Sequence, residues 1–178
     1  MPSYVAFLRA VNVGGRFVKM AELRRELEDA GFTGVETHIQ SGNVLVRSGR
    51  RSTGAVGTEM ARVLGEWAGF DVPCVVRTPA QLRSALAAVE SVPPLTEGGR
   101  RYVAFADGPV PTDAAARLDA WDAPGERCLV LGSEILAEMT GGFQQTKLTN
   151  TRVERITGRT TTWRDLKVVR AIDEKWGA

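Results

Sequence analysis

Apolar and polar residues alternate along the first half of the chain in the pattern of short strands separated by amphipathic helices. A strand at 4–7 precedes a helix at 20–30, in which Met20, Leu23 and Leu27 recur at helical spacing. The further predicted elements of this half are strands at 35–40, 43–48 and 72–78 and helices at 55–68 and 79–89.

The tetrapeptide Tyr-Val-Ala-Phe occurs twice, at residues 4–7 and again at 102–105. The order of elements after the second copy repeats that after the first, which favours an internal duplication over a chance match. Thr112 is predicted to cap the first helix of this second half. The predicted elements are strands at 102–106, 127–131, 134–139 and 159–162 and helices at 113–121, 147–157 and 166–176.

Each half therefore has the order β-α-β-β-α-β, which is typical of the ferredoxin-like or split βαβ unit. The predicted fold class is α+β, with two tandem ferredoxin-like subdomains packed as one compact protein. The first subdomain covers residues 1–78, a helix and connector cover 79–101, and the second subdomain with its C-terminal helix covers 102–178.

Composition sets limits on the class of protein. With 178 residues and 43% hydrophobic residues, the chain can bury a core as one domain or two small ones. No apolar run approaches the roughly 20 residues that span a bilayer, and Arg9 interrupts the first apolar run too early for a signal peptide. We therefore expect a cytoplasmic protein with no membrane partner. The net charge of +2, with a basic excess near both ends of the chain, is far weaker than that of a nucleic-acid-binding arm.

The predicted topology brings polar loops together at one end of the first sheet. In a split βαβ unit, the segment after the first strand lies near the turn between the second and third strands. These loops are residues 8–16 and 40–43, and in the second half residues 144–150 and 160–165 form another polar edge. Both edges combine cationic, amide and hydroxyl side chains with backbone N–H groups at glycines or helix starts. Such groups bind phosphate and carboxylate.

Several types of chemistry have no candidate residues. The edges contain no pair of carboxylates suited to acid–base catalysis and no nucleophile beside a base. His38 is the only histidine, and Cys74 and Cys128 lie in strand-like runs as small buried residues. We therefore predict no metal site and no cofactor.

The motifs resemble those of a bacterial uncharacterised family called domain of unknown function 1697. The resemblance rests on "YVAFLRAVNVGG", "KMAELRRELEDAGF", "VETHIQSGNV" and "FDVPCVVRT", and in the second half on "TKLTN" with Glu154. It implies a pair of ferredoxin-like subdomains and leaves the activity open. The segment "TTTWRDLKVV" departs from the family pattern, because it keeps either Trp163 or Arg164 in its usual place but not both.

Together, the polar edges and the resemblance assign a set of candidate ligand-binding residues. They are Arg9, Asn12, Gly14, Gly15, Lys19, Gln40, Ser41, Gly42, Asn43, Lys147, Thr149, Asn150 and Arg164. If the two halves pack about a pseudo-twofold axis, Lys147 and Arg164 approach Arg9, and one cleft gathers several cations around an anionic ligand. Each feature also has a plainer interpretation, namely a turn, a helix cap or a cation paired with a nearby carboxylate.

The hypothesis favoured by the sequence is a binding protein for a small phosphate- or carboxylate-bearing ligand, with a nucleotide among the candidates. Nucleic acid is a weaker candidate, because Phe7, Val44, Val46 and Phe105 do not form the aromatic platform of RNA-binding sheets. An enzyme that uses Arg and Lys to stabilise charge, and a structural or assembly module, remain as alternatives. Whether a reaction is catalysed, and the oligomeric state, are left open.

Overall fold

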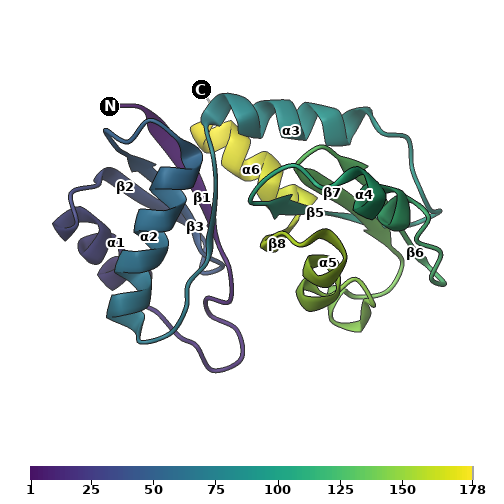
Figure 1. The fold of residues 1–178 in the computed structure, drawn as a ribbon, viewed down its shortest axis with the longest axis horizontal. Coiled ribbons are helices and arrows are strands. Elements are labelled where there is room, and N and C mark those ends of the chain that lie inside the picture. Colours follow the sequence, from purple (N-terminus) through teal and green to yellow (C-terminus); the bar gives the residue numbers. More distant parts are fainter. Residues whose placement is uncertain (178) are drawn as a thin grey trace. The chain divides into compact units, whose positions relative to one another are not determined.

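The protein is a mixed α+β structure (Figure 1), given by a computed structural model that describes residues 1–177. Within these residues, two four-stranded antiparallel sheets are accompanied by six α-helices. The chain divides into two compact units, which we call unit 1 and unit 2. Unit 1 holds residues 1–82 with the end of the chain from Ile172, and unit 2 holds Arg83–Ala171.

The sheet of unit 1 has the strand order β2-β3-β1-β4, so β1 lies between β3 and β4. Its strands are β1 (Ser3–Leu8), β2 (Thr33–His38), β3 (Asn43–Arg47) and β4 (Cys74–Arg77). The helices of unit 1 are α1 (Met20–Asp29) and α2 (Thr53–Ala68), and α3 (Pro79–Ser91) begins in unit 1 and continues from Arg83 in unit 2. Tyr4, Ala6 and Leu8 of β1 pack in one core with Leu27 of α1 and Leu64 of α2.

The sheet of unit 2 has the strand order β6-β7-β5-β8. Its strands are β5 (Arg100–Ala106), β6 (Glu126–Leu131), β7 (Glu134–Met139) and β8 (Thr161–Asp165). The helices are α4 (Thr112–Asp119), a 3-10 turn η1 (Phe143–Gln145), α5 (Asn150–Thr157) and α6 (Leu166–Trp176), which continues from Ile172 in unit 1. Tyr102 and Ala104 of β5 pack with Leu118 of α4, Val153 of α5 and Trp163 of β8.

Helix ends follow local sequence signals. Ser52 accepts a hydrogen bond from the Ala55 N–H at the start of α2. At the start of α3, the Thr78 hydroxyl accepts from the Gln81 N–H while the Gln81 side chain accepts from the Thr78 N–H, as a capping box does. Gly158 ends α5 with a left-handed backbone, φ 64°.

Three predictions about element ends are wrong in the second half. Pro111, not Thr112, is the residue that precedes α4, and no side chain caps that helix. α5 begins at Asn150 instead of residue 147, because the Thr149 hydroxyl accepts from the Arg152 N–H and caps it there. The last strand runs to Asp165 instead of residue 162, since 161–165 pairs with β5 along its whole length.

Structural features that could supply metal or thiol chemistry are scarce in the described part of the chain. Among residues 1–177, no three His, Cys, Asp or Glu side chains gather to hold a metal ion. Both cysteines are free, and burial raises the pKa of the Cys128 thiol to about 12 and that of Cys74 further still. No helix in the same range is long and apolar enough to cross a membrane.

Candidate functional site

The end of β1 and the turn between β2 and β3 lie together in unit 1. The Leu8 N–H donates to the Gly42 carbonyl oxygen at 2.8 Å, next to the pairing of Phe7 with Asn43. Beyond this point, Asn12 Nδ2 donates to the Gln40 carbonyl oxygen at 2.6 Å. The predicted meeting of these two loops is confirmed, and the Asn12 side chain bonds across them.

These two loops also hold the strained backbone of the protein. Ala10, Asn12 and Ile39 have φ values of 60°, 58° and 52°, and among the described residues they are the non-glycine residues with positive φ. The left-handed region is uncommon for residues with a side chain, and a β-branched residue such as Ile39 is an outlier there. Strain of this kind persists where the surrounding structure enforces it, and it collects at binding sites.

A cavity of about 740 Å³ opens beside the two loops, and we call it the α1 cavity. Its lining includes the first residues of α1, Met20 to Glu22. The other side chains that matter for binding are Asn12, Phe17, Lys19, Arg24, Gln40 and Trp67. The volume falls within the range of about 300–1,000 Å³ that is typical of small-molecule sites.

The start of α1 gives this cavity a positive character. Lys19 occupies the N-cap position and makes no side-chain cap, so the first turn of the helix lacks the usual side-chain acceptor. Unsatisfied N–H groups and the helix dipole favour an anion at such an end. Lys19 forms an exposed ion pair with Glu22 at 3.2 Å, which offsets part of its charge. Arg24 donates to the Thr37 hydroxyl at 2.7 Å, and this bond holds its guanidinium near β2.

The other candidate residues of this half shape the backbone instead of lining the cavity. Asn43 is fully buried, and its Nδ2 donates to the His38 carbonyl oxygen at 3.1 Å and to the Ser41 hydroxyl at 3.0 Å. Gly42 has φ 76° and packs against Leu8. The Arg9 N–H donates to the Pro73 carbonyl oxygen at 2.9 Å. The polar turn thus stabilises itself, while Asn12, Lys19 and Gln40 line the cavity.

Gly14 and Gly15 form the tip of the loop after β1. Their φ values are 61° and 83°, and a bridge between Val13 and Arg16 closes the tip. The guanidinium of Arg16 lies 5.3 Å from the centre of the Phe70 ring, which anchors the loop beside the end of α2. The glycines therefore allow the turn, and Arg16 fixes its position.

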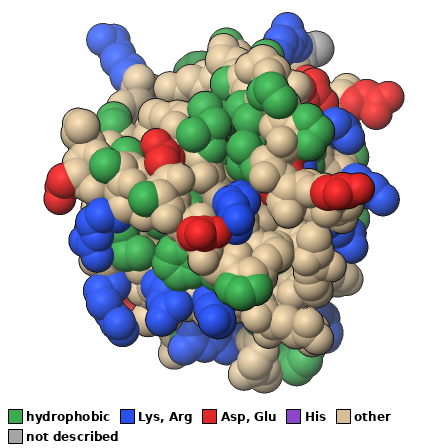
Figure 2. Space-filling view, turned by 90° about the vertical axis from the view of Figure 1, so that its right-hand side faces the viewer, with side chains coloured by type: hydrophobic (Ala, Val, Ile, Leu, Met, Phe, Trp, Pro, Cys, Tyr) green, Lys and Arg blue, Asp and Glu red, His purple; other side chains and the backbone are tan. Residues whose placement is uncertain are grey.

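Three candidate residues of the second half, Lys147, Thr149 and Asn150, lie at the start of α5. A smaller cavity of about 370 Å³ is lined by Lys147, Thr149, Thr151, Arg152 and Arg155. α5 lies low in Figure 1, and Figure 2 shows Lys and Arg side chains gathering in the lower left of the face drawn there.

Most polar groups around the start of α5 have structural partners. The Lys147 N–H donates to Glu126 Oε1 at 2.9 Å, and Asn150 Oδ1 accepts from the Thr161 hydroxyl at 3.2 Å. The guanidinium of Arg152 lies over the Trp121 ring at 5.5 Å. This end of unit 2 is cationic, but its groups serve local packing as well.

Arg164 is buried in β8 and does not line either of these cavities. Its Nη1 donates to the Thr162 hydroxyl at 2.8 Å and to the Trp163 carbonyl oxygen at 2.7 Å. Burial lowers the pKa of Arg164 to about 10, which leaves the guanidinium charged at neutral pH. Residues 160–165 were expected to form a polar edge, and the structure places 161–165 in the sheet.

The family is shown by comparison with known proteins. The family model described as "Protein of unknown function (DUF1697)" matches residues 1–135. The chain belongs to this family. The predicted resemblance is thereby confirmed, and the matched segment contains both loops of the α1 cavity.

A solved structure agrees with the fold of this DUF1697 protein. A conserved bacterial protein from Streptococcus pneumoniae is similar over 100% of this chain and 99% of its own, with a TM-score of 0.75 and 22% sequence identity. No protein with a curated description matches the sequence. At this identity the likeness concerns the fold alone.

Eight lining residues of the α1 cavity were not among the candidates from the sequence, and the ones that matter most here are Phe17, Arg24 and Trp67. Phe17 carried a signal, because a lone aromatic residue in a polar, glycine-bearing loop has no strand or helix face to bury it. Arg24 follows Met20 by one helical turn and so lies above the start of α1. Trp67 carried no such signal, because its spacing on α2 equally fits a core position.

Proposed function

We propose that this protein binds a small phosphate- or carboxylate-bearing ligand in the α1 cavity. The observation that carries the proposal is the uncapped start of α1, which opens into a cavity large enough for a metabolite. Gln40 adds an amide group to the lining, and Lys19 and Arg24 add positive charge. Backbone N–H groups, amides and cations together are the usual partners of oxyanions.

The charge balance of the lining supports an anion more than a cation. Lys19 and Arg24 outnumber the single carboxylate of Glu22, and Lys19 already pairs with that carboxylate. The exposed pair is weak, since surface ion pairs contribute on the order of 0–1 kcal/mol. An anionic ligand can therefore recruit Lys19 at little cost.

A binding role has more support than a catalytic one. Among the residues that line the α1 cavity, Lys19 and Glu22 are the groups that could transfer a proton, and each is partnered by the other. The lining also has no cysteine, serine or histidine to act as a nucleophile. The alternatives of an enzyme and of an assembly module stay open to test, as does the expected cytoplasmic location.

We further propose that the two halves are ferredoxin-like repeats produced by duplication. Support comes from two buried arginines at matching places. Arg77 pairs with Val5 in unit 1, and Arg164 pairs with Val103 in unit 2, where both valines follow the tyrosine of the repeated tetrapeptide. Each guanidinium also donates to the carbonyl oxygen of the preceding residue, Val76 at 3.0 Å and Trp163 at 2.7 Å. An experimental structure in which the two halves superpose with Arg77 on Arg164 would support duplication, and a shifted alignment would contradict it.

Anion binding is tested by titrating the protein with inorganic phosphate, simple carboxylates and sugar phosphates. A ligand at 100 times its dissociation constant stabilises the folded state by about 2.7 kcal/mol, which a thermal melt detects readily. Binding should weaken about tenfold or more in Arg24→Ala, because one charge-assisted hydrogen bond is lost. Arg25→Ala is the matched control, since Arg25 is exposed on the same helix and does not line the cavity.

The proposal is overturned if none of the anionic probes binds. It is also overturned if Arg25→Ala loses as much affinity for the probe as Arg24→Ala does. The same titration with Lys147→Ala tests the prediction that Lys147 shares a cleft with Arg9. Unaltered affinity in that variant would rule the shared cleft out and leave the α1 cavity as the site.

A further inference from the structure

Aromatic side chains border the proposed anion site. Phe17 exposes 79% of its surface, although it lines the α1 cavity. Beyond the first residue, the exposed large hydrophobic residues of the described chain are Val13, Phe17 and Ile39, and all belong to the two loops beside that cavity. Exposed apolar groups that collect at one place mark a surface that contacts something else.

Trp67 adds a second aromatic ring to the same cavity from the last turn of α2. It is half-buried against the core of unit 1, so its position is set by packing. The contact of Arg16 with Phe70 anchors the neighbouring loop and so positions Phe17 on the cavity as well. The cavity thus joins two aromatic side chains with the cationic start of α1.

We infer that the ligand of the α1 cavity carries a planar aromatic ring together with its anionic group, as a nucleoside monophosphate does. This inference rests on the proposed function, because it assigns a ligand class to the same site. A volume of about 740 Å³ far exceeds what a phosphate ion requires, and it suits a ligand of metabolite size. Bases stack on aromatic side chains whatever their sequence, because each has a π-face.

A mononucleotide fits the fold better than a nucleic-acid strand. Sheets that bind single-stranded RNA present aromatic side chains on an open face. Here Phe7 and Phe105, on the central strands of the two sheets, are both fully buried. Phe17 and Trp67 instead line the concave α1 cavity.

Calorimetric titration with four probes tests this inference. They are inorganic phosphate, ribose 5-phosphate, an uncharged nucleoside and the corresponding nucleoside 5′-monophosphate. We expect the nucleoside monophosphate to bind at least about tenfold more tightly than ribose 5-phosphate, since stacking adds to anion binding. This ratio should fall in Phe17→Leu, which keeps an apolar side chain without a ring and leaves Trp67 as the remaining ring of the lining, and return in Phe17→Tyr. Val13→Ala is the control, because Val13 is exposed in the same loop but does not line the cavity.

Each outcome separates this inference from the proposed function. Equal affinity for ribose 5-phosphate and the nucleotide, or a ratio unchanged in Phe17→Leu, overturns the nucleotide class and leaves anion binding in place. A short oligonucleotide that binds more than about tenfold tighter than the mononucleotide also overturns it. If no anionic probe binds, the proposed function fails and this inference fails with it.

Discussion

Asn12 Nδ2 donates a 2.6 Å hydrogen bond to the carbonyl oxygen of Gln40, and this bond joins the loop after β1 to the turn between β2 and β3. The Asn12 side chain also accepts a bond from the Val18 N–H at 2.9 Å. One amide therefore fixes both walls of the α1 cavity. Its backbone has φ 58°, a conformation that asparagine tolerates better than most residues.

Replacing Asn12 should destabilise the protein through two separable effects. Asn12→Gly removes both side-chain hydrogen bonds without backbone strain and should cost about 1–2 kcal/mol in the free energy of unfolding. Asn12→Ala removes the same bonds and adds the cost of a left-handed alanine, so it should be about 1 kcal/mol less stable than the glycine variant. Urea denaturation measures both. An alanine variant as stable as the glycine variant would show that this conformation is not enforced.

Gly42 is required by both its backbone and its surroundings. Its φ is 76°, and a Cβ there would lie 2.9 Å from Leu8 Cβ, closer than atoms of that kind approach. Gly42→Ala should therefore cost about 2 kcal/mol or more, from left-handed strain together with overpacking. Gly14→Ala is the matched control, because Gly14 has φ 61° and nothing within 4 Å of the added Cβ. Equal melting temperatures for the two variants would contradict the close contact with Leu8.

The order of strands and helices could be predicted because hydrophobic spacing and turn residues are local signals. The meeting of Asn12 with Gln40 could be predicted as well, because the β-α-β-β topology leaves few places for those loops. The α1 cavity could not be predicted from the sequence. Its walls depend on three non-glycine residues with positive φ, and the sequence carries no signal that Ala10 or Ile39 adopts that conformation.

The end of β8 shows a second limit of sequence reasoning. The last strand was predicted to end at residue 162 and residues 160–165 to form a polar edge, yet the strand continues through Trp163, which packs into the core of unit 2, and Arg164, which lies on the alternate position. Both are buried, and a buried arginine is rare enough that sequence patterns favour exposure. Arg101, at the end of the predicted connector, likewise binds a buried carboxylate.

That carboxylate belongs to Glu138, which holds the connector before β5. Glu138 Oε2 accepts from the N–H groups of Leu95 and Thr96, both at 2.7 Å, and Oε1 accepts from Arg101 Nε at 2.6 Å. The side chain of Glu138 is 2% exposed, and that of Arg101 is 18% exposed. Glu138→Ala should cost about 3–5 kcal/mol, because it leaves a largely buried cation and two N–H groups without their acceptor. Chemical denaturation measures the loss, and a change below about 1 kcal/mol would rule out this role.

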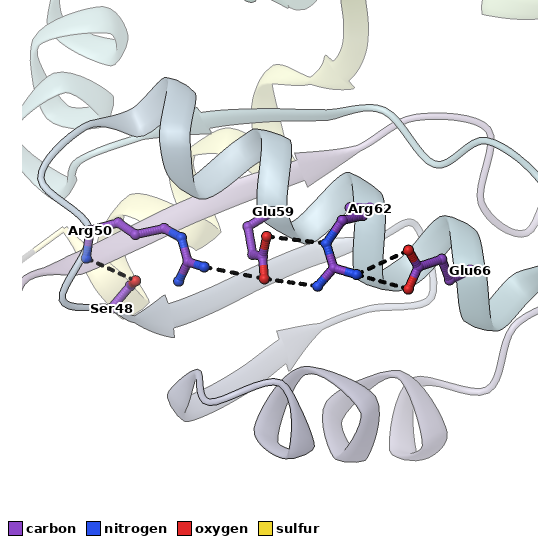
Figure 3. Close-up of polar contacts among 5 residues, drawn as sticks. All are labelled: Ser48, Arg50, Glu59, Arg62 and Glu66. Carbon is purple, nitrogen blue, oxygen red and sulfur yellow. Dashed lines mark hydrogen bonds and ion pairs between the residues drawn. The ribbon is translucent and has the colours of Figure 1, made fainter.

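A chain of exposed ion pairs runs along the surface of α2 (Figure 3). Unlike the buried pair of Glu138 and Arg101, these pairs contribute little to stability, and their contribution depends on pH and salt. Glu59 lies between Arg50 and Arg62, at 3.2 Å and 3.0 Å, and Arg62 also reaches Glu66 at 2.8 Å. The hydrogen bond from Arg62 is the main cause that lowers the pKa of Glu59 below its ordinary 4.5, and the charges of Arg62 and Arg50 act in the same direction.

Because the pKa of Glu59 is lower in the folded state, its ion pairs stabilise the protein above the unfolded pKa. That contribution is lost as the pH falls through the folded pKa, when the carboxylate becomes protonated in both states. We therefore expect Glu59→Gln to be slightly less stable than the unchanged protein at pH 7, with a difference that shrinks and is lost as the pH falls from 7 through the folded pKa of Glu59. Salt at about 0.5 M should shrink the difference at pH 7, since exposed charges are screened. Thermal melts across this pH range measure it, and a gap that widens on acidification would contradict the assigned pKa direction.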